Sequence, residues 1–408
     1  MPRPTHIARM LSALVSAGML ACGGGDRAEP AAAQPARRGL WVLAEGSQRV
    51  LEHPDRIPAL IATARSLAAT DLFVQVYRGG RAWYETGLAD DSPFRAARDA
   101  AAGADPLAVL LREAHAAGLR VHAWVNVLSL SQNRDAPLLR DLGRDAVLVD
   151  PHGRSLLDYP DLEVPPPDDA YYRMGTPALY LDPAAIGLSE RLAATFAELV
   201  ARHPELDGLH LDYIRLPDVL PFAPGSRFGV GLDFGHSAST RALFRDQTGL
   251  EAPQPKSSAN AEVWDAWRRD RVTALVAAIR SAARAAQPKL EISAAVIPYA
   301  DRAYLSLFQD WRRWLEDGLL EFAVAMVYTR DDRLLRYQTE SFAGTPLAPR
   351  IWLGLGSWIF AGEPARAVEQ IRIAQRAGAR ADALFSYDAI VEAPALAQAL
   401  AQPAAAGP

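Results

Sequence analysis

The sequence lacks residues that several classes of site require. Cys22 is the only cysteine, which excludes an intramolecular disulfide and a thiolate metal site. Positive charge is not in excess either: 43 Lys and Arg against 48 Asp and Glu give a formal net charge of -5. Binding to nucleic acid through counterion release is therefore disfavoured. Stability must come from a core, and 408 residues with 50% hydrophobic content suit one large α/β domain.

An apolar run long enough to cross a membrane is missing from the amino terminus. The run Met10–Ala21 is too short for that once cleaved, and it follows two arginines in the layout of a secretory signal peptide. It leads into Met-Leu-Ala-Cys, which resembles a bacterial lipobox. We therefore expect residues 1–22 to be a lipoprotein signal peptide with lipidation at Cys22. The alternative is an ordinary signal peptide cut nearby.

The two ends of the chain after Cys22 differ in composition from the long segment between them. Residues 23–36 are rich in Gly, Ala and Pro, which predicts a flexible tether. Residues 403–408 are expected to form a disordered tail. The segment between them, 37–402, is expected to fold as a single domain.

Short apolar runs alternate with longer amphipathic stretches through this domain, a pattern typical of repeated β-α units. Eight is the number of strands that closes a parallel barrel. The fold class is therefore predicted to be α/β, a (β/α)8 TIM barrel. The eight predicted strands are 39–44, 72–77, 121–126, 208–212, 292–297, 322–328, 351–355 and 383–387.

The intervening stretches predict helices and two unusually long connections. Helices are expected over 106–117 and 364–377, each beginning at a proline and ended by a glycine, and over 189–202 and 262–286. Long loops are expected after strands three and four, at 129–180 and 216–260. Such excursions usually build a substrate cleft.

The fourth strand carries the leading catalytic candidate. In the segment Asp207–Pro217, Leu209 and Leu211 alternate with His210 and Asp212, the period-two pattern of a strand that ends in polar groups. Reacting groups in a (β/α)8 barrel lie on the carboxyl ends of the strands. Asp212 is therefore expected to be catalytic. The alternative is a carboxylate that only accepts hydrogen bonds from loop amides.

With these strands placed, the chain resembles the bacterial glycosyl hydrolase-like family 10 barrels, distant relatives of the α-amylase type of fold. The motifs that carry the resemblance are Arg38-Gly-Leu-Trp41, Tyr180-Leu-Asp-Pro183, Asp207-Gly-Leu-His-Leu-Asp-Tyr-Ile-Arg-Leu-Pro217, Ala266-Trp-Arg-Arg-Asp-Arg271, Gln309-Asp-Trp-Arg-Arg-Trp314 and Met326-Val-Tyr-Thr329. The resemblance implies that Asp212 matches the nucleophile of amylase-type enzymes. His210 stands where those enzymes have Arg, and Tyr77 and Gly80-Arg81 depart from the family pattern after strand two.

Glycoside hydrolysis also needs a proton donor. The fifth strand has no Glu at the position that amylase-type enzymes use, so we favour Asp301 and Asp388 as catalytic partners of Asp212. Glu45 and Asp331, which follow strands one and six, compete with them. Each of these acids has the alternative interpretation of a loop or capping residue.

Aromatic and polar residues near other strand ends suit a sugar, because rings stack on pyranose faces and polar groups bind hydroxyls. His210 has the alternative of a hydrogen-bonded core histidine. The expected substrate-binding residues are Gln75, Asn126, His210, Tyr213, Arg215, Tyr328, Trp358 and Tyr387. No metal and no cofactor are expected, because the chain has no Gly-rich phosphate loop joined to a Lys and no paired His on strand one.

Two hypotheses of function follow. The first is an exported, lipid-anchored glycoside hydrolase that faces the periplasm and cuts a bacterial envelope polysaccharide, with the glycan of peptidoglycan as the leading substrate. The second is a catalytically inactive glycan-binding or scaffolding lipoprotein. The missing Glu on strand five and the altered Tyr77 and Arg81 motivate the second hypothesis. In both, the partners are a polysaccharide and, through the lipid at Cys22, a membrane.

Overall fold

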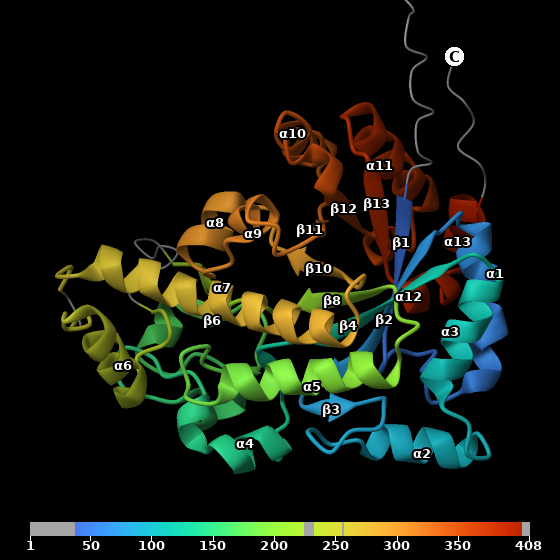
Figure 1. Cartoon of the computed structure of the whole chain (residues 1–408). Coiled ribbons are helices and arrows are strands. Elements are labelled where there is room, and N and C mark those ends of the chain that lie inside the picture. The colour runs from blue at the N-terminus through green and yellow to red at the C-terminus, as the bar shows by residue number, and fades with distance from the viewer. Residues whose placement is uncertain (1–36, 224–231, 255–256, 402–408) are drawn as a thin grey trace, which may run out of the picture. The chain divides into compact units, whose positions relative to one another are not determined.

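Eight parallel strands close into a barrel (Figure 1). The computed structural model describes residues 37–223, 232–254 and 257–401. The first strand pairs with both the second and the last, which closes the ring. The predicted (β/α)8 barrel is confirmed. Its strands are β1 Arg37–Val42, β2 Asp71–Arg78, β4 Arg120–Asn126, β8 Gly208–Asp212, β10 Glu291–Val296, β11 Phe322–Val327, β12 Ile351–Gly356 and β13 Ala381–Phe385.

Helices cover the outside of the barrel, and the four predicted ones are present within a few residues. Asp105 caps α3 by accepting hydrogen bonds from the amides of Leu107 and Ala108. The amphipathic helices α5 and α7 lie side by side (Figure 1). The helices that follow strands are α1 Ile57–Ser66, α3 Pro106–Ala116, α5 Leu188–Arg202, α7 Ala261–Ala286, α9 Trp311–Glu316, α10 Asp332–Ala343, α11 Pro364–Arg376 and α13 Pro394–Ala401.

Shorter elements occupy the connections at the carboxyl ends of the strands. The segments after β4 and β8 pair with one another through β6 and β9, and β5 pairs with β7. These elements are β3 Arg81–Ala82, α2 Ser92–Ala100, β5 Ser129–Ser131, α4 Pro137–Leu142, β6 Tyr172–Met174, β7 Leu179–Tyr180, β9 Val219–Pro221, α6 Ala238–Thr248, α8 Ala300–Leu305 and α12 Tyr387–Val391.

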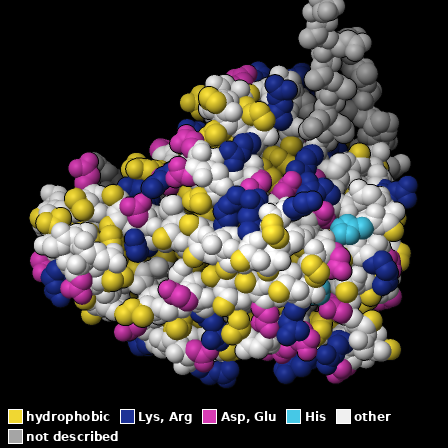
Figure 2. All heavy atoms as spheres, viewed as in Figure 1, with side chains coloured by type: hydrophobic (Ala, Val, Ile, Leu, Met, Phe, Trp, Pro, Cys, Tyr) yellow, Lys and Arg dark blue, Asp and Glu magenta, His cyan; other side chains and the backbone are white. Residues whose placement is uncertain are grey.

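The predicted signal peptide, the lipidation site at Cys22, the tether and most of the tail lie outside the described residues. Within the described part of the chain, no helix combines the length and the apolar character that crossing a membrane requires. On the face that carries α5 and α7, side chains of both charges are interspersed with apolar ones (Figure 2). That face therefore carries no continuous surface of a single charge.

Aromatic side chains fill the barrel interior. The rings of Phe322 and Trp352 stack with centroids 4.3 Å apart, and Phe73 stacks at the same distance on the imidazole of His210. Trp41 and Trp124 belong to the same buried cluster. Such rings bury a large area each and pack with defined geometry, so the barrel axis is a solid core.

A buried ion network closes the amino-terminal end of the barrel. The Asp71 side chain is fully buried, accepts from Nε2 of His122 at 2.9 Å and pairs with Arg37. The guanidinium of Arg37 lies 4.7 Å from the ring centroid of Trp352. Burial alone would raise the pKa of Asp71, but hydrogen bonds from His122 and Arg37 hold it well below its usual range. The ionised form of Asp71 therefore stabilises the fold.

Replacing Asp71 by Asn should lower the free energy of unfolding at pH 7 by about 3 kcal/mol, because it breaks a buried ion pair and leaves Arg37 without its main partner. Since the folded-state pKa is lowered, the wild-type advantage should be full above about pH 5 and shrink as the pH falls toward the folded-state pKa. Urea unfolding at pH 7 and pH 4 measures this. Asp99→Asn, at an exposed residue of α2, is the control, and equal losses in the two variants would contradict the prediction.

Candidate functional site

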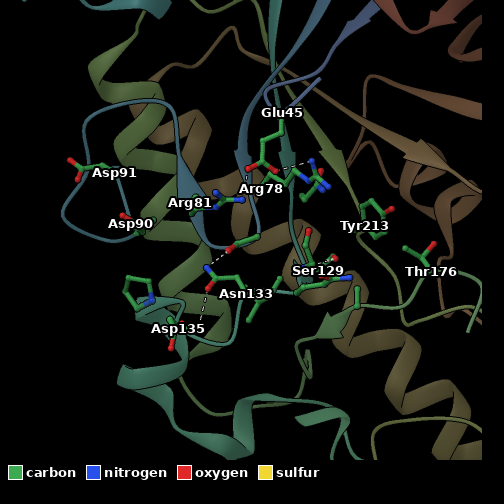
Figure 3. A pocket seen from close by; sticks show the side chains of 18 of the residues that line it. Glu45, Arg78, Arg81, Asp90, Asp91, Ser129, Asn133, Asp135, Thr176 and Tyr213 are labelled. Carbon is green, nitrogen blue, oxygen red and sulfur yellow. Dashed lines mark hydrogen bonds and ion pairs between the residues drawn. The ribbon is translucent and has the colours of Figure 1, made fainter. Parts of the chain in front are cut away.

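A cleft of about 1080 Å³ lies over the carboxyl ends of β1, β2, β4 and β8 (Figure 3). Arg78 and Asn126 are the last residues of β2 and β4, and Glu45 and Tyr213 follow β1 and β8 closely. Most of the remaining wall comes from the segment after β4. The other polar residues that line it are Arg81, Asp90, Asp91, Arg95, Ser129, Ser131, Gln132, Asn133, Asp135, Arg140 and Thr176. The position and the polar wall suit a hydroxyl-rich ligand.

Asp212 ends β8 beside this cleft. Its Oδ1 accepts from the amide of Tyr213 at 2.7 Å, and its Oδ2 accepts from Nε1 of Trp124 at 3.1 Å. The residue is 6% exposed. Burial raises the pKa of Asp212, and the Tyr213 amide, Arg215 and Trp124 oppose that rise. A carboxyl group with a raised pKa at a strand end is a common arrangement for acid-base chemistry.

Asn126 and Gln75 form a polar pair next to Asp212. Asn126 lies opposite Asp212 in the register of β4 and β8. Nε2 of Gln75 donates to Oδ1 of Asn126 at 3.2 Å, and Oε1 of Gln75 accepts from the amide of Ala44 at 3.3 Å. Asn126 lines the cleft, whereas Gln75 is buried behind it. Gln75 therefore positions Asn126 from within the barrel.

Tyr213 and Arg215 continue the chain past Asp212. Tyr213 lines the cleft and has a positive φ of 49°, which turns the chain sharply at the end of the strand. The guanidinium of Arg215 lies 4.9 Å from the Tyr213 ring centroid and is buried. Burial raises the pKa of Tyr213, so its hydroxyl keeps its proton. The two residues support the rim around Asp212.

The structure places His210 in the packed interior, one layer below the rim. It is 0% exposed. Its Nε2 accepts from Nε1 of Trp41 at 3.3 Å and its Nδ1 lies 2.8 Å from Oγ of Ser293. Burial lowers the pKa of His210 well below its usual value. Both nitrogens are occupied by protein groups, which matches the alternative of a hydrogen-bonded core histidine and leaves no atom for a substrate.

Tyr328, Trp358 and Phe385 form an aromatic cluster on the other side of Asp212. Tyr328 meets Trp358 edge to face at 4.8 Å and lies 5.7 Å from Phe385, whose ring is 6.2 Å from Trp124. Trp358 is 41% exposed. Burial, followed by the charge of Asp212, raises the pKa of Tyr328 well above its usual value. The cluster offers an accessible ring at the mouth of the barrel.

Asp388 anchors the loop that follows β1. Its Oδ1 accepts from the amide of Gln48 at 2.9 Å, and its Oδ2 from the amide of Leu43 at 3.4 Å. A Cβ added to Gly46 would lie 2.1 Å from Oδ1 of Asp388, so the loop packs directly on this carboxylate. Burial raises the pKa of Asp388, and the two amides oppose that rise. Its neighbour Tyr387 is also buried. Both residues support the loop rather than line the cleft.

The other predicted acids lie in three different settings. Asp301 is exposed in the first turn of α8 and lines a separate hollow of about 360 Å³. Asp331 caps α10 by accepting from the amides of Arg333 and Leu334. Glu45 lines the main cleft, where it pairs with Arg78 at 2.9 Å and with Arg81. Only Glu45 among these three shares the cleft with Asn126 and Tyr213.

Several wall residues were not predicted from the sequence. Arg78 could have been found, because it directly follows the apolar run of strand two. Arg95 and Arg140 belong to the short helices α2 and α4 and Thr176 to a connection, and because none of them follows a predicted strand, the strand pattern does not place them at the cleft. No group of three or more potential metal ligands occurs among the residues that the structure describes.

Comparison with known proteins identifies the family. The sequence profile described as Glycosyl hydrolase-like 10 matches residues 36–345. The chain belongs to this family. The glycosyl hydrolase-like 10 match covers β1 to β11 of the barrel and includes the cleft and Asp212, and it confirms the resemblance that the strand motifs indicated.

Curated relatives carry glycosidase names. Glycosyl hydrolase DigH of Escherichia coli K12 is 25% identical over 286 residues, which are 65% of this chain and 56% of that protein. Glycosyl hydrolase YngK of Bacillus subtilis is 24% identical over 311 residues, or 72% of this chain and 51% of that protein. The chain thus spans about half the length of these relatives.

Solved structures share the fold. The catalytic domain of β-amylase from Paenibacillus polymyxa superposes with a TM-score of 0.54 and 11% identity, covering 90% of this chain and 99% of that one. α-L-Fucosidase isoenzyme 2 from Paenibacillus thiaminolyticus gives a TM-score of 0.53 and 12% identity, covering 90% and 49%. At these identities the likeness concerns the barrel architecture alone.

Replacing Trp124 by Phe should raise the pKa of Asp212 further, because it removes the indole N–H that stabilises the charged carboxylate and keeps an aromatic ring in place. We expect an upward shift of up to about one pH unit, the size of one hydrogen bond to a charged group. A 13C NMR titration of the Asp212 carboxyl carbon measures it. Trp267→Phe, on the distant helix α7, is the control, and a downward or absent shift in Trp124→Phe would refute the assignment.

Proposed function

We propose that this chain is a glycoside hydrolase in which Asp212 is the essential carboxyl group. One observation carries the proposal: Asp212 ends a barrel strand beside the main polar cleft, and its carboxylate is held by two donors in a buried setting that raises its pKa. Glycoside hydrolysis uses carboxyl groups in this position. Membership of the glycosyl hydrolase-like 10 family and the glycosidase names of the relatives support the same reaction class.

We propose further that the substrate is a bacterial envelope polysaccharide, and that the glycan strand of peptidoglycan is the first to test. The lipobox-like segment ending at Cys22 supports this, because a lipid anchor would hold the domain at a membrane that faces the wall. A cleft of about 1080 Å³ has room for more than one sugar unit. In this proposal the protein is exported and faces the periplasm.

The ion pairs of Glu45 favour a second candidate function. Glu45 follows β1 and shares the cleft with Asn126 and Tyr213, and it is bound to Arg78 and Arg81. A carboxylate held in this way is poorly placed for the second role of ordinary two-carboxylate hydrolysis. The alternative is a glycan-binding or scaffolding lipoprotein without activity. Sustained release of shorter saccharides from purified glycan strands excludes it, whereas tight binding without cleavage supports it.

Replacing Asp212 by Asn should lower the turnover of purified glycan strands by about 100- to 10 000-fold, because the amide keeps the shape but neither gives nor takes a proton. Glycan binding should remain detectable. Chromatography of the released saccharides measures turnover, and a pull-down on insoluble strands measures binding. Asp301→Asn, at the exposed acid of α8, is the matched control. Full activity in Asp212→Asn would reject the catalytic role.

Replacing Cys22 by Ala should release the protein from membranes, because the thiol is the point where the lipid is expected to be attached. Fractionation of cells that express each form measures the partition, with the wild type sedimenting and the variant remaining in the supernatant. Metabolic labelling with a fatty-acid analogue gives a second readout. A variant that sediments and is labelled like the wild type would contradict the anchor.

A further inference from the structure

The acids considered as partners of Asp212 are engaged by other groups or lie elsewhere, and Asp90, Asp91 and Asp135, which also line the cleft, come from the segments after β3 and β5 and not from the end of a barrel strand. Both oxygens of Glu45 are occupied by Arg78 and Arg81. Both oxygens of Asp388 accept from backbone amides. Asp301 is exposed and lines a different hollow. Ordinary retention or inversion needs a second carboxyl group at the scissile bond, and Glu45 and Asp388 are engaged while Asp301 lies elsewhere.

The same rim carries donors that have no acceptor. The hydroxyl of Tyr328 and Nε of Arg215 are buried without a hydrogen-bond partner in the described part of the chain. Buried polar groups in native proteins are almost always paired, so an unpaired one at a functional rim requires an explanation. Nε of Arg215 can only donate and the Tyr328 hydroxyl can donate, so an acceptor oxygen on a ligand would satisfy either group.

Ring contacts connect Tyr328 to the indole that binds Asp212. The Tyr328 ring contacts Phe385, Phe385 contacts Trp124, and Trp124 donates to Asp212. The accessible ring of Trp358 packs against Tyr328 at the same place. The cluster therefore combines a hydroxyl donor with apolar surface, and two ring contacts link it to Trp124, the indole that donates to Asp212. An acetamido substituent matches this combination, because it pairs a strong carbonyl acceptor with a methyl group.

We propose that the substrate supplies the nucleophile: the site takes a 2-acetamido sugar whose carbonyl oxygen, oriented by the Tyr328 hydroxyl, attacks the anomeric carbon while Asp212 protonates the leaving oxygen. This inference rests on the glycoside hydrolase function proposed above. Glycosidases that use substrate assistance are a known exception to the two-carboxylate scheme. Here the exception accounts both for the engagement of Glu45 and Asp388 by other groups and for the unpaired Tyr328 hydroxyl.

The steps balance as a hydrolysis. The bond from the acetamido oxygen to the anomeric carbon forms as the glycosidic bond breaks, and the leaving oxygen takes the proton of Asp212. The product is a cyclic oxazolinium ion, and Asp212 is left as a carboxylate. Water then adds to the anomeric carbon from the opposite side, its proton returns to Asp212, and the ring opens to restore the acetamide. Two inversions at one carbon give a product with retained configuration.

The first experiment compares three preparations of the same glycan strands: intact, N-deacetylated, and N-deacetylated then re-acetylated. We expect the deacetylated strands to be cut at least about 100-fold more slowly, the loss typical of removing one catalytic group. Re-acetylation should restore the rate, and 1H NMR should show retention in the first product. Equal cleavage of deacetylated strands, or inversion, overturns this inference and leaves the glycosidase function standing. No cleavage of intact strands overturns both.

The second experiment tests Tyr328. Tyr328→Phe should lower kcat on intact strands by about 100-fold with a much smaller change in KM, because the hydroxyl acts mainly as the reaction proceeds. A thiazoline analogue of the cyclic intermediate should inhibit the wild type competitively and bind the variant at least tenfold more weakly. Tyr337→Phe, at an exposed tyrosine of α10, should behave like the wild type. A thiazoline that does not inhibit, or a 2-fluoro sugar that forms an ester with Asp212, would refute substrate assistance.

Discussion

The closure of the parallel barrel is the constraint on which the rest of the structure depends. Because β1 pairs with both β2 and β13, every strand ends on the same rim. The register then decides which residues meet there, and it puts Asn126 opposite Asp212. A shift of one residue would turn each of these side chains to the other face of the sheet. The place of the Asp212 carboxyl group thus follows from hydrogen bonds between the strand backbones.

The barrel interior is graded in polarity from one end to the other. At the amino-terminal end, Asp71 is buried but its charge is balanced by Arg37, and its carboxylate accepts a hydrogen bond from His122. In the middle, aromatic rings surround a neutral His210. At the carboxyl end, Asp212 is buried with hydrogen-bond donors but without a direct ion pair among the described residues. The pKa of Asp71 is therefore lowered and that of Asp212 raised, although both are aspartates inside one barrel.

The sequence allowed the barrel and the position of Asp212 to be predicted, because both depend on local patterns: apolar runs, helix boundaries and a polar residue at a strand end. His210 shows the limit of this reasoning. Alternation places its side chain toward the barrel axis, but the depth along the axis depends on Trp41 and Ser293, which lie far away in the chain. Asp388 shows the same limit, since its partners are amides more than 300 residues earlier.

The residues that line the cleft are the part of the structure that is hardest to predict from the sequence. Contacts between the segments that carry these residues nevertheless fix the shape of the cleft. Where the structure describes them, the long segments after β4 and β8 consist mostly of short elements, and they brace one another. β6 pairs with β9, and the buried carboxylate of Asp182 accepts from the hydroxyl of Thr240 at 2.7 Å. Asp218 then ties the second segment to Arg302 of α8. Each contact joins residues that lie far apart in the chain, and their local sequence does not predict the contact. The shape of the cleft therefore depends on the tertiary structure. The barrel fixes where Asp212 lies, and these braced segments shape the cleft beside it.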